Sequence, residues 1–339
     1  MRIDAYTHFI PKKFTEKMNE QAGALADIGK RMRGIPSLHD LDVRLKVVDQ
    51  FKDYAQILSY AMPPLEVFAN PQQCEEYSRI INDGFVEICA KYPDHFPGWV
   101  AQVSLAAPDA GAGEAERAIK QLGALGVQIH TNVNDKPLDR PEYAPFFAKM
   151  NELGKPIWLH PNRGANHPDY IDEKKSLYEI WWTFGWSYET AAAMGRLVMS
   201  KIIDNNPNLK IILHHFGGII PMLEGRIGPG WDQLGTRTSD ADYVSLRKSL
   251  KKRPLDYFKQ DFWADTATFG GKGAMLCGLD FYPEDKILFA SDCPFDPEKG
   301  TGYIRMTLDI LDGLNLPKAL REKIDYKNLE ALTGVKLVK

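Results

Sequence analysis

Eight short runs of β-branched and aromatic residues recur along the chain, and this repetition constrains its fold more than any other feature. Most of the stretches between them have helical periodicity, as in 114–125, where residues 115, 118, 119 and 122 are apolar. Strands that alternate with helices pair in parallel through right-handed crossovers. The predicted strands are 2–7, 54–59, 98–103, 126–130, 156–160, 210–214, 261–265 and 286–291.

Eight strand–helix units favour a closed (β/α)8 TIM barrel, with an open doubly wound α/β sheet as the alternative that the pattern alone allows. Three long connections, 10–48, 161–190 and 221–254, leave the carboxyl ends of strands 1, 5 and 6. We expect helical insertions in these loops, which in a barrel build the active site. Neither an internal repeat nor an interdomain linker is visible, so residues 1–339 are expected to form one barrel domain.

The composition excludes several functional classes. Hydrophobic residues make up 44% of the 339 residues, enough for a large core, and 42 basic against 45 acidic residues argue against a nucleic-acid-binding surface. The sequence has no apolar run of about 18 residues that could span a membrane, and its start does not resemble a signal peptide. The four cysteines form no C-x-x-C pair, which indicates a reduced protein of the cytoplasm.

Polar residues end most of the predicted strands. A carboxylate ends strand seven, another follows strand eight, and five of the eight histidines fall at the same rim: His8, His130, His160, His214 and His215. Imidazole nitrogens and carboxylate oxygens are ligands for Zn²⁺ and similar ions, and a catalytic metal needs about three protein ligands and an open position. His8, His160 and Asp292 meet that requirement if strands one, five and eight converge.

Each of these residues also has a structural interpretation. A single histidine more often makes hydrogen bonds in a core than binds a metal, and Asp265 or Asp292 could cap a helix. His214 and His215 are adjacent, so alternation along a strand predicts that only one of them faces the barrel mouth. No lysine ends strand four, so a carboxylated lysine that bridges two metals has no candidate there, and one metal is favoured over two.

Two stretches, 211–221 and 287–295, resemble the H-x-G-G…P and S-D-x-P-F segments of the amidohydrolase superfamily. The resemblance is to the branch of aminocarboxymuconate-semialdehyde decarboxylase and related nonoxidative aromatic-acid decarboxylases. Segments 126–134, 138–145 and 153–161 also resemble this branch, so the likeness covers nearly the whole chain. It implies a (β/α)8 barrel with one divalent metal held by His8, His160 and Asp292. Zn²⁺ is the ion expected first, and Mn²⁺ is the alternative.

The resemblance also implies how protons move at the site. His215, aligned through the two glycines and the proline that follow it, matches the histidine that activates a metal-bound water or relays protons. His214 is then its packed neighbour. Asp292 would hold the metal and could also shuttle a proton.

Substrate contacts follow from the same resemblance. Arg44 matches an arginine that binds the substrate carboxylate, which suits a planar guanidinium, and Arg226 matches one that reaches the site of a neighbouring subunit in a homodimer. Tyr6 stands where the family has its first strand-one ligand, but a phenol with a pKa near 10 is a poor ligand unless ionised. Tyr6, with His130 and Phe295, is therefore expected to contact the substrate, and His130 could also assist the metal.

The predicted activity is a metal-dependent nonoxidative decarboxylation, a C–C lyase reaction on a small aromatic or unsaturated carboxylic acid. A hydrolase or hydratase of a lactone or keto-acid that uses the same mononuclear site is the alternative. A third interpretation is a non-catalytic barrel that lost its metal when Tyr6 replaced the usual ligand.

Overall fold

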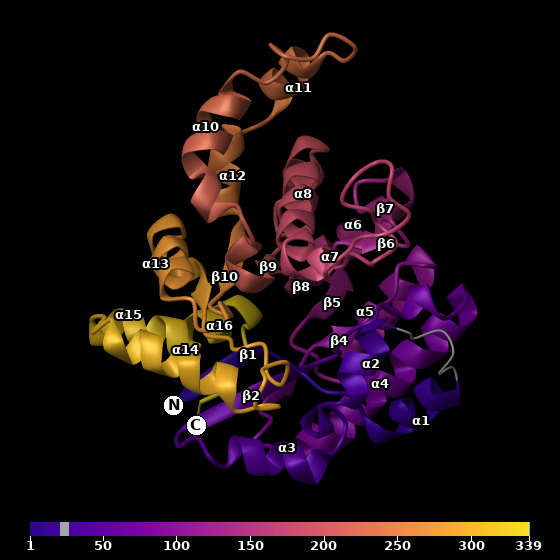
Figure 1. Ribbon diagram of the computed structural model, residues 1–339, viewed down its shortest axis with the longest axis vertical. Coiled ribbons are helices and arrows are strands. Elements are labelled where there is room, and N and C mark those ends of the chain that lie inside the picture. Colours follow the sequence, from indigo (N-terminus) through magenta and orange to yellow (C-terminus); the bar gives the residue numbers. More distant parts are fainter. Residues whose placement is uncertain (21–26, 339) are drawn as a thin grey trace.

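The computed structural model describes residues 1–20 and 27–338 (Figure 1). All eight predicted strands are present, and the third is divided into two short strands. In chain order they are β1 (Arg2–His8), β2 (Tyr54–Ser59), β3 (Gly98–Trp99), β4 (Ala101–Gln102), β5 (Val127–His130), β8 (Ile157–His160), β9 (Ile211–Leu213), β10 (Phe262–Asp265) and β11 (Ile287–Leu288). A small antiparallel hairpin, β6 (Asn132–Val133) and β7 (Lys136–Pro137), follows β5.

The barrel strands are all parallel and lie in the orders β1-β2-β3 and β11-β10-β9-β8-β5-β4. The two groups meet at Val100, between β3 and β4. The amide of Val100 donates to the carbonyl oxygen of Leu58 at 2.8 Å, and that of Ala101 donates to Gly126 at 3.0 Å. One predicted strand therefore pairs with β2 through its first half and with β5 through its second.

The barrel closes between its first and last strands. The amide of Ala5 donates to the carbonyl oxygen of Phe289, and the amide of His8 donates to that of Cys293, each at 2.8 Å. These bonds make the α/β architecture a closed (β/α)8 barrel, as the alternation of strands and helices predicts.

Helices surround the strands (Figure 1). The connection after β1 contains α1 (Lys12–Glu20), α2 (Asp27–Arg33) and α3 (Leu41–Val48), and single helices α4 (Pro71–Lys91), α5 (Pro108–Lys120) and α6 (Ala144–Leu153) follow the next strands. After β8 come α7 (Ile180–Thr183), α8 (Gly185–Met199) and α9 (Ile202–Asn205). After β9 come α10 (Glu224–Asp232), α11 (Tyr243–Ser249) and α12 (Pro254–Gln260), which extend away from the barrel in Figure 1. The chain ends with α13 (Lys272–Phe281), α14 (Gly302–Gly313), α15 (Lys318–Glu322) and α16 (Asn328–Thr333).

Apolar side chains fill both sides of the strands. Ile57, Val100, Trp158 and Ile212 pack together in one cluster, and a larger cluster lies between the strands and the surrounding helices. Trp158 is fully buried, and its indole N–H donates to the carbonyl oxygen of Ala5 at 2.9 Å, so the ring fills space without leaving a polar atom unpaired. Across the described ranges, none of the helices has the length and apolar character needed to cross a bilayer.

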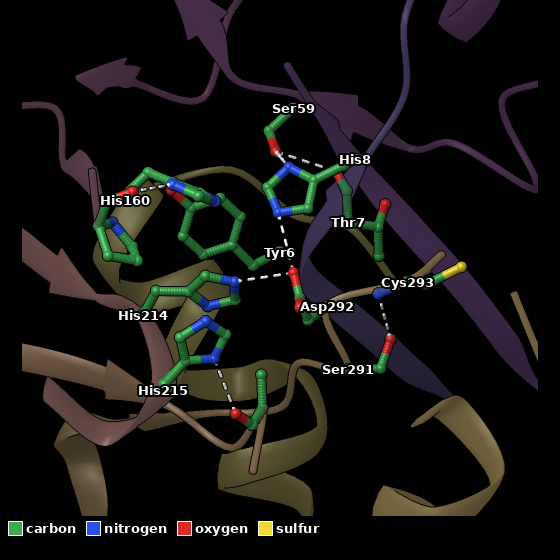
Figure 2. Close-up of polar contacts among 12 residues, drawn as sticks. Tyr6, Thr7, His8, Ser59, His160, His214, His215, Ser291, Asp292 and Cys293 are labelled. Atoms are coloured by element: carbon green, nitrogen blue, oxygen red, sulfur yellow. Dashed lines mark hydrogen bonds and ion pairs between the residues drawn. The ribbon is translucent and has the colours of Figure 1, made fainter. Parts of the chain in front are cut away.

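Strand β1 contains a bulge just before the predicted site. Asp4 is opposite Gln56 and Thr7 is opposite Leu58, so two residues of β1 face one residue of β2. Bulges redirect side chains and are frequent beside active sites. Figure 2 shows the side chains of Tyr6 and His8 lying beside those of His160 and His214.

Candidate active site

Three buried histidines from different strands meet at the carboxyl end of the barrel (Figure 2). His8 ends β1, His160 ends β8, and His214 follows β9. One ring nitrogen of each lies within 4.8 Å of the others. The carboxylate of Asp292 joins them, because its Oδ1 is 3.1 Å from Nε2 of His8 and 3.1 Å from Nε2 of His214. The structure thus brings together the three metal ligands that the resemblance implies, and adds His214.

Each of the three imidazoles is held through its Nδ1 atom. The acceptors are the carbonyl oxygen of Tyr60 for His8 at 2.8 Å, that of Pro161 for His160 at 2.7 Å, and Asp265 for His214 at 2.6 Å. An oxygen that accepts from Nδ1–H leaves Nε2 with the lone pair that binds a metal. Nε2 of His8 is buried and makes no hydrogen bond to the described residues. The donor set therefore fits a divalent metal ion.

The residues of the cluster differ in the direction in which their pKa values are shifted. Burial, reinforced by the neighbouring histidines, holds the pKa of His160 well below its ordinary value, so this ring is neutral at neutral pH. Burial also acts to lower the pKa of His214, but Asp265 and Asp292 outweigh it and raise that pKa to about 9. Burial acts to raise the pKa of Asp292, but the adjacent imidazoles of His214 and His8 outweigh it and hold that pKa well below its usual range. The carboxylate of Asp292 is therefore ionised.

His214 and His215 lie in a turn rather than on a strand. β9 ends at Leu213, and His215 and Phe216 have left-handed φ angles of 56° and 52°. The rings of the two histidines stack with their centroids 3.6 Å apart. The expectation that His214 packs away from the site is therefore wrong, because the alternation of a strand ends before the pair begins.

Asp265 holds both histidines in this turn. Its Oδ2 accepts from His214, and its Oδ1 accepts the backbone amides of His215 at 3.0 Å and Ala267 at 3.1 Å. His215 is half-buried, and its own Nδ1 lies 2.8 Å from the carbonyl oxygen of Ala267. Burial, followed by the nearby His214, lowers the pKa of His215 to about 4, so the ring is neutral at neutral pH. Asp265 thus acts as a hydrogen-bond acceptor in this turn and not as a helix cap.

Tyr6 lies against the histidines and keeps its proton. Its ring centroid is 4.0 Å from that of His214 and 5.2 Å from that of His8, and its side chain is fully buried. Burial, then Asp265 and Asp292, raises the pKa of Tyr6 well above 10. Its hydroxyl has no hydrogen-bond partner within residues 1–20 and 27–338. A neutral phenol in this position is a hydrogen-bond donor rather than a metal ligand.

Three further ring side chains lie next to the cluster. Phe295 lies 5.5 Å from the ring of His8, and Trp186 and His130 lie 5.9 Å and 5.5 Å from that of His160. Burial, followed by the neighbouring His8, lowers the pKa of His130 to about 3. Sequence reasoning did not single out Trp186 as a site residue, because its place in a tryptophan-rich loop does not reveal which ring faces the histidines.

The two predicted arginines lie in very different places. Arg44 on α3 is fully buried and donates to the Sγ of Cys293 at 2.8 Å and to the backbone carbonyl of His8. Its terminal nitrogens therefore join the ends of the first and last strands, a placement that favours a structural role. Arg226 is exposed on α10, in the part of the chain that extends from the barrel (Figure 1).

Comparison with known proteins gives a consistent result. The sequence profile described as amidohydrolase matches residues 3–332. The γ-resorcylate decarboxylase of Rhodococcus jostii is 30% identical over 301 residues, which cover 86% of each chain. The 2-amino-3-carboxymuconate-6-semialdehyde decarboxylase of Dictyostelium discoideum is 25% identical over 311 residues, covering 87% of this chain and 82% of the relative.

A solved structure agrees with this result. The crystal structure of a dihydroxybenzoic acid decarboxylase from a Polaromonas species, with bound manganese and the inhibitor 2-nitroresorcinol, superposes with a TM-score of 0.78 at 27% identity. The match covers 98% of this chain and 96% of that one. The chain therefore belongs to the amidohydrolase family, in the branch that contains the nonoxidative aromatic-acid decarboxylases.

Proposed function

We propose that this protein is a metal-dependent nonoxidative decarboxylase of a small aromatic carboxylic acid. The observation that carries the proposal is the convergence of three buried imidazoles at the mouth of the barrel, each fixed through Nδ1, with the carboxylate of Asp292 3.1 Å from two of them. The named activities of its relatives support the same reaction class.

We assign His8, His160 and Asp292 as ligands of one divalent ion. When bound, such an ion supplies positive charge that holds substrate oxygens and stabilises the negative charge that develops as the carboxylate leaves. The manganese in the Polaromonas structure makes Mn²⁺ the first ion to test, with Zn²⁺ as the alternative. A site of imidazole and carboxylate ligands accepts either ion.

His215 is assigned as the residue that moves the proton. Decarboxylation breaks the bond between the ring carbon and the carboxylate, releases CO₂ and places a proton on that carbon. Because Nδ1 of His215 is bonded to Ala267, Nε2 is the atom that takes a proton from a hydroxyl of the substrate and delivers it to the ring carbon from which CO₂ leaves. Asp292 is a second residue, after His215, through which a proton can pass.

The surrounding side chains suit a flat, polar substrate. Phe295 and Trp186 offer ring faces beside the ligands, and aromatic rings pair favourably in offset or edge-to-face arrangements. The unpartnered Tyr6 hydroxyl and Nε2 of His130 are buried polar atoms that a hydroxyl or carboxylate of the substrate would satisfy. Arg44, already bonded to protein atoms, is assigned a positioning role.

We also propose a homodimer in which Arg226 enters the partner's site. Its exposure on α10 and the exposed Phe184, Tyr188 and Met222, which are 72%, 58% and 73% accessible, support an interface on this side. Mixing two inactive variants, Arg226→Ala and His215→Ala, tests it. If Arg226 acts across the interface, random mixed dimers regain about a quarter of wild-type turnover. If it acts within its own subunit, no activity returns.

The decarboxylation itself is tested by measuring CO₂ release from γ-resorcylate with the Mn²⁺-loaded protein. We expect release to be lost in His215→Ala while the metal content is unchanged, because this ring is separate from the assigned ligands. Full turnover in that variant would remove the role of His215. A product that contains added water, without CO₂, would replace the proposal with the hydrolase or hydratase alternative.

A further inference from the structure

His214 occupies the same position relative to Asp292 as the assigned ligand His8. Both place Nε2 at 3.1 Å from the same carboxylate oxygen, Oδ1 of Asp292. A ring nitrogen of His214 also lies within 4.8 Å of those of His8 and His160. An ion that bound those two histidines and Asp292 would therefore have His214 within its coordination range.

At Nδ1 the hydrogen bonding of His214 repeats that of the two assigned ligands, whereas its Nε2 is hydrogen-bonded to Asp292 and would exchange that bond and its proton for the ion. His8 and His160 give Nδ1 to backbone carbonyls, and His214 gives Nδ1 to the fully buried Asp265. A carboxylate on Nδ1 fixes the orientation of a ligating imidazole and raises its basicity. The amides of residues 215 and 267 hold the other oxygen of Asp265, so this carboxylate cannot rotate freely.

Strand β1 brings one imidazole to the cluster, that of His8, because Tyr6 presents a phenol ring whose centroid lies 4.0 Å from that of His214. On the basis of the proposed function, we propose that His214 is a fourth protein ligand of the metal ion and that Asp265 is the carboxylate that orients it.

Adjacent histidines thereby take different tasks. His214 is fully buried and belongs to the group with His8 and His160, whereas His215 is half-buried and is bonded to Ala267. The left-handed backbone of the turn allows this division, because it brings both rings to the mouth, one stacked on the other. His215→Ala is therefore the matched control for His214→Ala.

The test measures Mn²⁺ binding to the full chain, by equilibrium dialysis with elemental analysis, and needs no activity. Loss of an outer-shell partner costs about 10- to 100-fold in metal affinity. We therefore expect a loss of about 100-fold or more in His214→Ala, about 10-fold in Asp265→Asn, and less than about threefold in His215→Ala. Pulsed EPR of bound Mn²⁺ with ¹⁵N-histidine then counts the coordinated imidazoles. The signal should correspond to three rings in the wild type and His215→Ala, and to two in His214→Ala at saturating Mn²⁺.

Each contrary result has a distinct meaning. If the wild type binds no Mn²⁺ or Zn²⁺, the proposed function and this inference both fail. If His214→Ala keeps wild-type affinity and imidazole count, His214 is not a ligand, and the proposed function stands. If His214→Ala and His215→Ala lose the ion equally while His8→Ala keeps it, the ion sits on the group of His214, His215 and Asp265, and the inference is overturned.

Discussion

Replacement of Arg44 by methionine separates a structural arginine from one that binds the substrate. Methionine keeps most of the buried volume but removes the bonds to the His8 carbonyl and the Cys293 thiol. Two hydrogen bonds from a charged donor are together worth about 3–6 kcal/mol. Part of this is offset, because the variant no longer buries a guanidinium whose Nε has no acceptor among the described residues. We expect the free energy of unfolding to fall by about 2–4 kcal/mol.

Urea unfolding of the chelator-treated protein measures this loss, and steady-state kinetics of the Mn²⁺-loaded protein measures KM. Lys46→Met is the matched control, because it removes a cation from an exposed position of the same helix. Metal affinity should fall with stability in Arg44→Met, since the two bonded atoms flank the proposed ligands His8 and Asp292. Unchanged stability with a KM raised tenfold or more would refute this reasoning and assign Arg44 to the substrate carboxylate.

Three further perturbations test other parts of the structure. Mn²⁺ at 100 times its Kd should raise the free energy of unfolding by about 2.7 kcal/mol in urea titrations, and His160→Ala should abolish this increase. Burial raises the pKa of Asp4 from 3.8 to about 6, so the folded chain binds more protons than the unfolded one between these values and loses stability as pH rises. The stability of Asp4→Asn relative to the chelated wild type should therefore grow by up to about 3 kcal/mol between pH 4 and pH 7, and a pH-independent difference would contradict the assignment. In Gly278→Ala the new Cβ would lie 2.3 Å from the buried ring of Phe216, so melting curves should show that the free energy of unfolding falls by about 1–3 kcal/mol. In the control Gly273→Ala, on the same helix, the new Cβ meets nothing within 4 Å, so the change should be neutral or stabilising.

The barrel could be predicted from sequence because each strand is a short apolar run with a distinct end. The division of the third strand at Val100 could not, since it depends on which neighbour each half pairs with. A helical insertion after β9 was expected from the length of the connection 221–254, but the extension of its helices away from the barrel is a tertiary property (Figure 1).

The site was predictable to the level of residue type and strand end. His8, His160 and Asp292 could be grouped because each lies at the end of a predicted strand of one barrel, and the family resemblance implied them as ligands. The orientation of His214 was not, because a left-handed φ at a histidine and a phenylalanine has no sequence signal comparable to that of glycine. The bond between Asp265 and His214 could not be predicted either. A carboxylate at a strand end can bind a metal, cap a helix or accept a hydrogen bond, and only the position of the His214 ring decides among these roles.

The bonds that close the barrel join segments that are synthesised far apart in time. Asp4 accepts the amide of Ser291 across 287 positions, and His8 donates to Cys293. At about 5–20 residues per second, roughly 15 to 60 s of translation separate these two segments. Throughout that time one edge of β1 has no partner, and His8 has no Asp292 to face. The proposed metal site therefore cannot be complete before the segment that carries Asp292 has been synthesised and has joined β1.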